Sequence, residues 1–271
     1  MKPLKTLVAL GLAGALLSTP ALAQREGVNV GQNSVFTGLV SAEDIEATAL
    51  QQYRQVLREA AQQNALAPAN NEQLQRLRAI ANRIIPHALA WNPRARDWKW
   101  EVNLIGSKQI NAWCMPGGKI AFYTGILNQL KLTDDEVAAV MGHEIAHALR
   151  EHARERAGKS AATNLGANVF SELLGLGALG RTVVGGGVQL IGLSFSRENE
   201  TDADLVGLEL AARAGYDPRA AVTLWQKMNT AAKGAPPQWL STHPSGNARI
   251  AGIERNLPRV MPLYERARSG G

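Results

Sequence analysis

The two histidines of the pentapeptide HEIAH, His143 and His147, have the spacing of metal ligands on a helix. Residues four apart lie on one helical face, so both imidazoles can bind one Zn²⁺ ion. Glu144 lies about 100° further round the helix, where its carboxylate can deprotonate a water held by the ion. Roughly one chain of this length in a hundred carries the pattern by chance, so the pattern alone does not establish a zinc site. A third ligand from elsewhere in the chain would strengthen the prediction.

The acidic cluster ENETDAD at 198–204 is the best source of that third ligand. A catalytic zinc site needs three protein ligands and one open position. The cluster opens a predicted helix, and Glu200 and Asp204 repeat the four-residue spacing on one face. Glu198 and Asp202 fall on other faces and are expected to be solvated.

The other histidines and the cysteine are weaker candidates. His152 follows His147 by five residues and is expected to point away from the ligand face. His87 adjoins the helix-breaking Pro86 and is predicted to be structural. Cys114 is the only cysteine, which excludes an intrachain disulfide, and we expect a buried, inert thiol.

HEIAH, the later SRENETDAD and the upstream NAWCMPGGKIAFYTGIL together resemble a known family. It is that of the zinc endopeptidases grouped with the CaaX prenyl protease and HtpX, whose pattern is HExxH followed by SRxxExxAD. The resemblance runs from about Trp98 to Arg249. It is nearest in style to the exported bacterial members, including the periplasmic type that assists outer-membrane β-barrel assembly. We expect neither the transmembrane helices nor the helical repeats of some relatives.

The resemblance implies a role for each matching residue. His143, His147 and Glu200 would bind one zinc ion per chain, with Glu144 as general base and Asp204 orienting a zinc-bound histidine. STHPSGNAR matches the family's THP segment, and two active-site roles are open for its histidine, His243. It could stabilise the oxyanion, or occupy the open zinc position as a reversible inhibitory ligand; the alternative is a loop histidine that caps local structure.

The resemblance also implies an edge strand beside the cleft, within the stretch 111–123. Such an edge binds an extended peptide as an additional strand. The candidates for substrate contact are Asn111, Gly117, Gly118 and Arg249. The expected function is endopeptidase cleavage of unfolded or misassembled exported proteins. A metal-stabilised chaperone with little proteolysis and a zinc hydrolase of cell-wall peptides are the alternatives.

The first 23 residues have the pattern of a cleaved signal peptide. Two lysines precede an apolar run over 7–17 that is shorter than the roughly 20 residues of a membrane span. We therefore predict a soluble periplasmic protein, which could associate peripherally with the outer membrane. Without these residues 27 basic residues stand against 23 acidic ones, and with no basic patch interleaved with aromatic residues nucleic acid is not an expected partner.

The remaining pattern predicts a mainly helical α+β fold with a small antiparallel sheet. The resemblance implies that this is a zincin-like metalloprotease domain, with the sheet beside the HEIAH helix. We predict a flexible leader over 24–40 and one domain over 41–271, made of a helical hairpin at 41–90 and a catalytic core at 98–255. The Gly-rich segment 161–195 is either a mobile lid or a packed hairpin without a gating role. The six tryptophans are assigned to packing.

Overall fold

The computed structural model describes residues 26–173, 190, 194–232, 237–243 and 246–270. The predicted signal peptide, 1–23, lies outside the described residues. The elements are the 3₁₀ helices η1 (Val35–Leu39), η2 (Ile85–Ala90) and η3 (Pro93–Arg96), the strands β1 (Glu101–Ile105), β2 (Ala112–Met115) and β3 (Lys119–Tyr123), and the α-helices α1 (Ala42–Gln62), α2 (Glu72–Ile84), α3 (Thr124–Gln129), α4 (Asp134–Leu149), α5 (His152–Leu173), α6 (Arg197–Arg213), α7 (Ala220–Ala231), α8 (Gln238–Thr242) and α9 (Asn247–Ser269). The predicted mainly helical α+β fold is confirmed.

The three strands form one sheet in the order β1-β3-β2. β2 and β3 are antiparallel, as predicted, and are joined by a turn in which Gly117 and Gly118 both have positive φ. The prediction is wrong for β1, which runs parallel to β3. The period-two pattern indicates strands but not their order, and here the second strand of the hairpin, rather than the first, lies next to β1.

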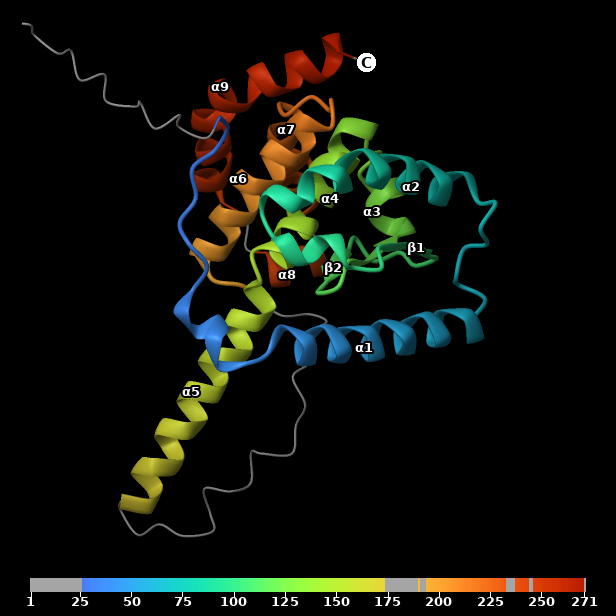
Figure 1. Ribbon diagram of the computed structural model, residues 1–271. Coiled ribbons are helices and arrows are strands. Elements are labelled where there is room, and N and C mark those ends of the chain that lie inside the picture. The colour runs from blue at the N-terminus through green and yellow to red at the C-terminus, as the bar shows by residue number, and fades with distance from the viewer. Residues whose placement is uncertain (1–25, 174–189, 191–193, 233–236, 244–245, 271) are drawn as a thin grey trace, which may run out of the picture.

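Alternate residues of the strands belong to two separate hydrophobic clusters, one on each face of the sheet. Val102, Leu104, Ile120 and Phe122 join the cluster that contains α2 and α4. The opposite face joins the cluster of α1 with Ile105, Trp113, Met115 and Ala121. Both helices expected over 41–90 are present, but the sheet lies between them (Figure 1), so they do not pack as a hairpin.

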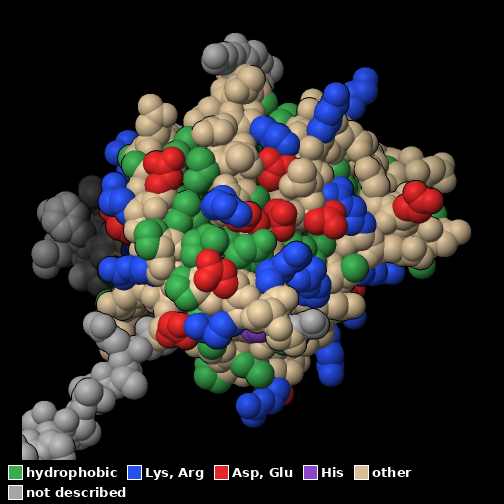
Figure 2. All heavy atoms as spheres, turned by 90° about the horizontal axis from the view of Figure 1, so that it is seen from above, with side chains coloured by type: hydrophobic (Ala, Val, Ile, Leu, Met, Phe, Trp, Pro, Cys, Tyr) green, Lys and Arg blue, Asp and Glu red, His purple; other side chains and the backbone are tan. Residues whose placement is uncertain are grey.

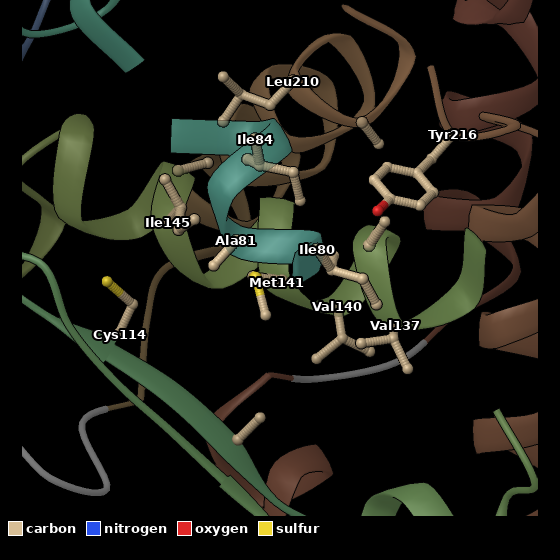
Figure 3. Close-up of a cluster of buried hydrophobic side chains, with 14 of the residues drawn as sticks. Ile80, Ala81, Ile84, Cys114, Val137, Val140, Met141, Ile145, Leu210 and Tyr216 are labelled. Carbon is tan, nitrogen blue, oxygen red and sulfur yellow. The ribbon is translucent and has the colours of Figure 1, made fainter. Parts of the chain in front are cut away.

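Helix α4 is the central element of the core and is buried along most of its length. Thr133 and Glu136 form the predicted capping box at its start, with both reciprocal hydrogen bonds present. Figure 3 shows side chains of α2 gathered beside those of α4, including Ile80, Ala81, Ile84, Val140, Met141 and Ile145. The helix that carries HEIAH is thereby fixed on a rigid support.

Helix α6 crosses α4 where two glycines meet. A Cβ on Gly207 would lie 2.6 Å from the backbone nitrogen of His143, and one on Gly142 would lie 2.7 Å from the carbonyl oxygen of Gly207. Only glycine at both positions lets the two backbones approach this closely. This crossing brings the acidic start of α6 to the histidines of α4.

Residues 26–40 form an attached segment rather than the expected flexible leader. The backbone N–H of Val28, which is buried, donates to the Glu209 carboxylate of α6 at 2.8 Å. Asn33 donates to the Glu151 carboxylate at 3.1 Å. The composition of this stretch shows no period, and these contacts with distant residues have no signal in the local sequence.

Helix α5 projects from the body (Figure 1) and continues to Leu173, so the first part of the segment 161–195 is helical. Residues 174–189 and 191–193 lie outside the described residues, and the lid and the packed hairpin both stay predictions.

Among the described helices none has the length and hydropathy needed to cross a membrane. Basic and acidic side chains are interspersed on the face in Figure 2.

Candidate metal centre

His143 and His147 of α4 meet Glu200 of α6 and His243, which directly follows α8. One ligand atom from each of these four residues lies within 4.8 Å of all the others, and all four residues are buried. The two Nε2 atoms of His143 and His147 are 3.1 Å apart. The Glu200 carboxylate lies 3.6 Å from the first and 3.5 Å from the second.

These distances suit a zinc ion. Two ligand atoms each about 2.0–2.1 Å from zinc lie roughly 3.3 Å apart in tetrahedral geometry. In the described part of the chain, Oε1 of Glu200 and Nε2 of His243 are buried without a hydrogen-bond partner of their own. Arg249 Nη1 does form an ion pair with Glu200, at 2.5 Å. The unsatisfied lone pairs point to a cation as their missing partner.

Burial governs the charges of this cluster. It lowers the pKa of His143 to about 4 and raises the pKa of Glu200 to about 8, because charge is disfavoured away from water. It also lowers the pKa values of His147 and His243. The imidazoles are therefore neutral at pH 7, as metal ligation requires.

Asp204 lies behind His143, on the side away from the other ligands. Its Oδ1 is 3.2 Å from Nδ1 of His143. Arg249 of α9 donates to both oxygens of Asp204, at 2.7 and 2.6 Å, and its guanidinium lies 3.8 Å from the ring centre of Trp225. Burial raises the pKa of Asp204, but Arg249 and His143 outweigh it and the net shift is downward. An ionised Asp204 fixes the tautomer of His143, with Nε2 free to bind metal.

Glu144 is fully enclosed beside the cluster. Trp239 of α8 donates its indole N–H to Oε1 of Glu144 at 2.6 Å. Nε2 of His243 is 3.6 Å from the same oxygen. Burial raises the pKa of Glu144 to about 8, although the Trp239 hydrogen bond opposes this. A carboxyl group with a pKa near neutrality is suited to both accepting and returning a proton.

Residues 70–257, well over half of the chain, match the family model Peptidase family M48. The chain belongs to this family. It therefore contains a zinc metallopeptidase domain, which confirms the predicted enzyme class and cofactor. This match does not distinguish subgroups within the family, so the closer relationship to the CaaX prenyl protease and HtpX stays a prediction.

Relatives of two kinds are similar to this M48 chain. The mitochondrial metalloendopeptidase OMA1 of Arabidopsis thaliana is 41% identical over 173 residues, which cover 63% of this chain and 35% of the relative. OMA1 of Schizosaccharomyces pombe is 38% identical, with 62% and 50% covered. The β-barrel assembly-enhancing protease of Escherichia coli is 28% identical over 211 residues, covering 73% and 42%. The aligned region thus spans about a third to a half of the length of these relatives.

The four residues predicted to contact substrate do not gather at one place. Asn111 is half-buried next to the start of β2. A Cβ on Gly118 would collide with the Trp100 ring at 2.7 Å, and one on Gly117 would meet Glu46, so both glycines serve the β2–β3 turn. The buried guanidinium of Arg249 is held by Glu200 and Asp204. Contact of these four residues with substrate stays a prediction.

Three residues close to the M48 site were misjudged or missed from the sequence. The sequence predicts only a packing role for Trp239, yet its indole N–H donates to Glu144; the local sequence offers no signal except its place four residues before His243. His152 does not join the metal cluster, as predicted, but its Nδ1 lies 2.9 Å from Nδ1 of His147. Asp202, expected to be solvated, is mostly buried against His152 and Arg150. Glu198 is exposed, and His87 lies in η2 away from the cluster, as predicted.

Proposed function

We propose that this chain is a zinc-dependent endopeptidase that hydrolyses peptide bonds in unfolded or misassembled exported proteins in the periplasm. The observation that carries the proposal is the buried set His143, His147 and Glu200 with Glu144 beside it. The three are the zinc ligands in this proposal, and Glu144 is the general base.

When bound, zinc supplies the Lewis acidity that makes a water nucleophilic near neutral pH and polarises a peptide carbonyl. The Glu144 carboxylate accepts the proton from the attacking water and returns it to the leaving nitrogen. Asp204 holds His143 in the tautomer that binds zinc, and Arg249 keeps Asp204 ionised. The low-dielectric surroundings strengthen each of these interactions.

In the same proposal α8 is a latch that keeps the enzyme latent. His243 occupies the open ligand position, while Trp239 engages the base Glu144. The Trp239 backbone N–H also donates to the carbonyl of Ile110, just before the edge strand β2, at 3.1 Å. The inhibitory role of His243 thus has more support than the oxyanion role, since its Nε2 lies among the ligand atoms.

Substrate would bind as an added strand along β2, which is an edge strand of the sheet. All four residues of β2 are buried and α8 is tied to the segment that precedes it. In this proposal α8 moves away when a peptide binds along β2, which would withdraw His243 and Trp239 together. Backbone pairing makes little demand on sequence and favours unfolded chains over folded ones.

The periplasmic location is supported by the signal-like residues 1–23 and by the Escherichia coli relative, named a β-barrel assembly-enhancing protease. The OMA1 relatives are named mitochondrial. Peripheral association with the outer membrane belongs to the same proposal. Unfolded polypeptide is the proposed partner, and nucleic acid is not.

The test is cleavage of unfolded casein and of a folded control protein by the zinc-loaded chain from residue 24. Glu144→Gln is the matched variant, because it keeps size and hydrogen bonding but cannot accept a proton. We expect cleavage of casein by the wild type, faster with His243→Ala, and none with Glu144→Gln. Binding of casein without cleavage by any variant would favour the chaperone, and cleavage of peptidoglycan peptides in place of casein would favour the cell-wall hydrolase.

A further inference from the structure

A series of hydrogen-bonded side chains lies behind His147, on the side away from the metal cluster. Nδ1 of His147 is 2.9 Å from Nδ1 of His152. Nε2 of His152 is 3.2 Å from Oδ2 of Asp202, which also accepts from Nε of Arg150 at 2.6 Å. His152 is 2% exposed, so water is largely kept from this series.

The contacts allow one consistent placement of protons. If Nε2 of His147 faces the metal cluster as a lone pair, its proton is on Nδ1 and is donated to His152. His152 must then accept at Nδ1 and carry its own proton on Nε2. That second proton is donated to Asp202, whose charge is balanced by Arg150. Each donor meets one acceptor along the whole series.

The two histidines of HEIAH are thus supported in different ways by the same helix. Asp204 of α6 reaches His143 directly, at 3.2 Å. Asp202, also on α6, reaches His147 through the imidazole of His152, which spans the gap between the carboxylate and the ligand. Both carboxylates are held by an arginine, Asp204 by Arg249 and Asp202 by Arg150.

This series of hydrogen bonds continues from Asp202 through Arg150 to the N-terminal segment, residues 26–40. Arg150 donates through Nη2 to the carbonyl oxygen of Gly31. Gly31 lies between the anchored residues Val28 and Asn33. The segment thus holds Arg150 against Asp202, and residues 31, 150, 202 and 152 form one continuous path to His147.

We propose that His152 is a positioning residue for zinc binding, which accepts the Nδ1 proton of His147 and is itself fixed by Asp202. A ligand histidine whose second nitrogen is held in this way keeps its orientation and is a stronger base. The inference rests on the proposed site, because it requires His147 to be a zinc ligand.

The experiment measures the zinc dissociation constant by competition with a chelator of known affinity. The protein used is the chain from residue 24 onward, without the predicted signal peptide. His152→Ala is expected to weaken zinc binding about 10- to 100-fold, the usual cost of losing such a partner. His152→Asn places its Oδ1 near the position of Nδ1 and is expected to recover much of the loss. The matched control is His87→Ala, which removes a histidine outside the site and is expected to leave the constant unchanged.

A double-mutant cycle tests the link to Asp202. Asp202→Ala alone is expected to weaken zinc binding, but to add little in the background of His152→Ala, because the path is already broken. Far-UV circular dichroism of the zinc-free proteins checks folding. If His152→Ala does not fold, the Asn and Asp202→Ala variants carry the test.

Wild-type affinity in a folded His152→Ala protein would overturn the inference, and so would an Asn variant as weak as the Ala variant. Full additivity in the cycle would remove Asp202 from the path. None of these results touches the proposed function, which fails instead if the wild type does not bind zinc or if His147→Ala binds it equally well.

Discussion

A single methyl group at the crossing of α4 and α6 should destabilise the fold and displace the zinc ligands. In Gly207→Ala the new Cβ would lie 2.6 Å from the nitrogen and 2.9 Å from the Cα of His143. Carbon atoms pack at 3.5–4.0 Å, so α6 must move away from α4 by roughly 1 Å. The methyl meets backbone rather than a flexible side chain, so no rotamer change can remove the clash.

Two quantities should change. Overpacking costs about 1–3 kcal/mol of the free energy of unfolding, and the better helix propensity of alanine returns up to about 1 kcal/mol. We expect a net loss of about 1–2 kcal/mol, or a Tm lower by about 2–8 °C for a domain of this size. Ligand–zinc distances stay within about 0.2 Å of their usual values. Moving Glu200 by several times that amount should weaken zinc binding by about tenfold or more, since losing only the partner that orients a ligand already costs about 10- to 100-fold.

The assays are thermal unfolding of the zinc-free protein and chelator competition for zinc. Gly252→Ala is the matched control, because its Cβ would meet only the end of Arg255 at 3.9 Å. That variant should be as stable as the wild type, or more stable by up to about 1 kcal/mol. Wild-type Tm and zinc affinity in Gly207→Ala would refute the claim that this contact positions the ligands.

Three further outcomes are expected. His243→Ala should cleave unfolded casein several-fold faster with zinc retained, whereas slower cleavage would support the oxyanion role. Burial raises the pKa of Glu136, but hydrogen bonds from Lys227 and Thr133 outweigh it and the net shift of the pKa is downward. Because the pKa is lower in the folded than in the unfolded state, the stabilising effect of Glu136 is present above about pH 4.5 and is lost as the pH falls through the folded pKa. Urea unfolding from pH 7 to the acid side of 4.5 should therefore show a smaller pH dependence in Glu136→Gln. Zinc removal by a chelator should lower Tm in calorimetry, because zinc at 100 times its Kd stabilises by about 2.7 kcal/mol, and an unchanged Tm would argue against a site formed between helices.

The parts of the site that could be predicted follow from helix periodicity. His143 and His147 are one turn apart, as are Glu200 and Asp204, and the structure brings both pairs together. The capping box of α4 is equally local. These features depend on residues within a few positions of each other, which a sequence displays directly.

What could not be predicted depends on contacts between distant segments. Trp239 reaches Glu144 across 95 positions, and Asp202 reaches His152 across 50. Helix periodicity predicts that His152 points away from His147, but the helix breaks at Arg150 and Glu151, and this break turns the side chain back towards His147. The parallel pairing of β1 depends on strand order, and the attached segment 26–40 depends on α6. None of these long-range contacts produces a periodic pattern in the sequence.

The most direct test of the zinc site is an anomalous difference map at the zinc edge from a crystal of the zinc-loaded protein. The arrangement of α4 and α6 predicts one peak per chain, about 2.0–2.2 Å from Nε2 of His143, Nε2 of His147 and a carboxylate oxygen of Glu200. A peak bound by other residues, or no peak at these three atoms in well-folded protein, would contradict it.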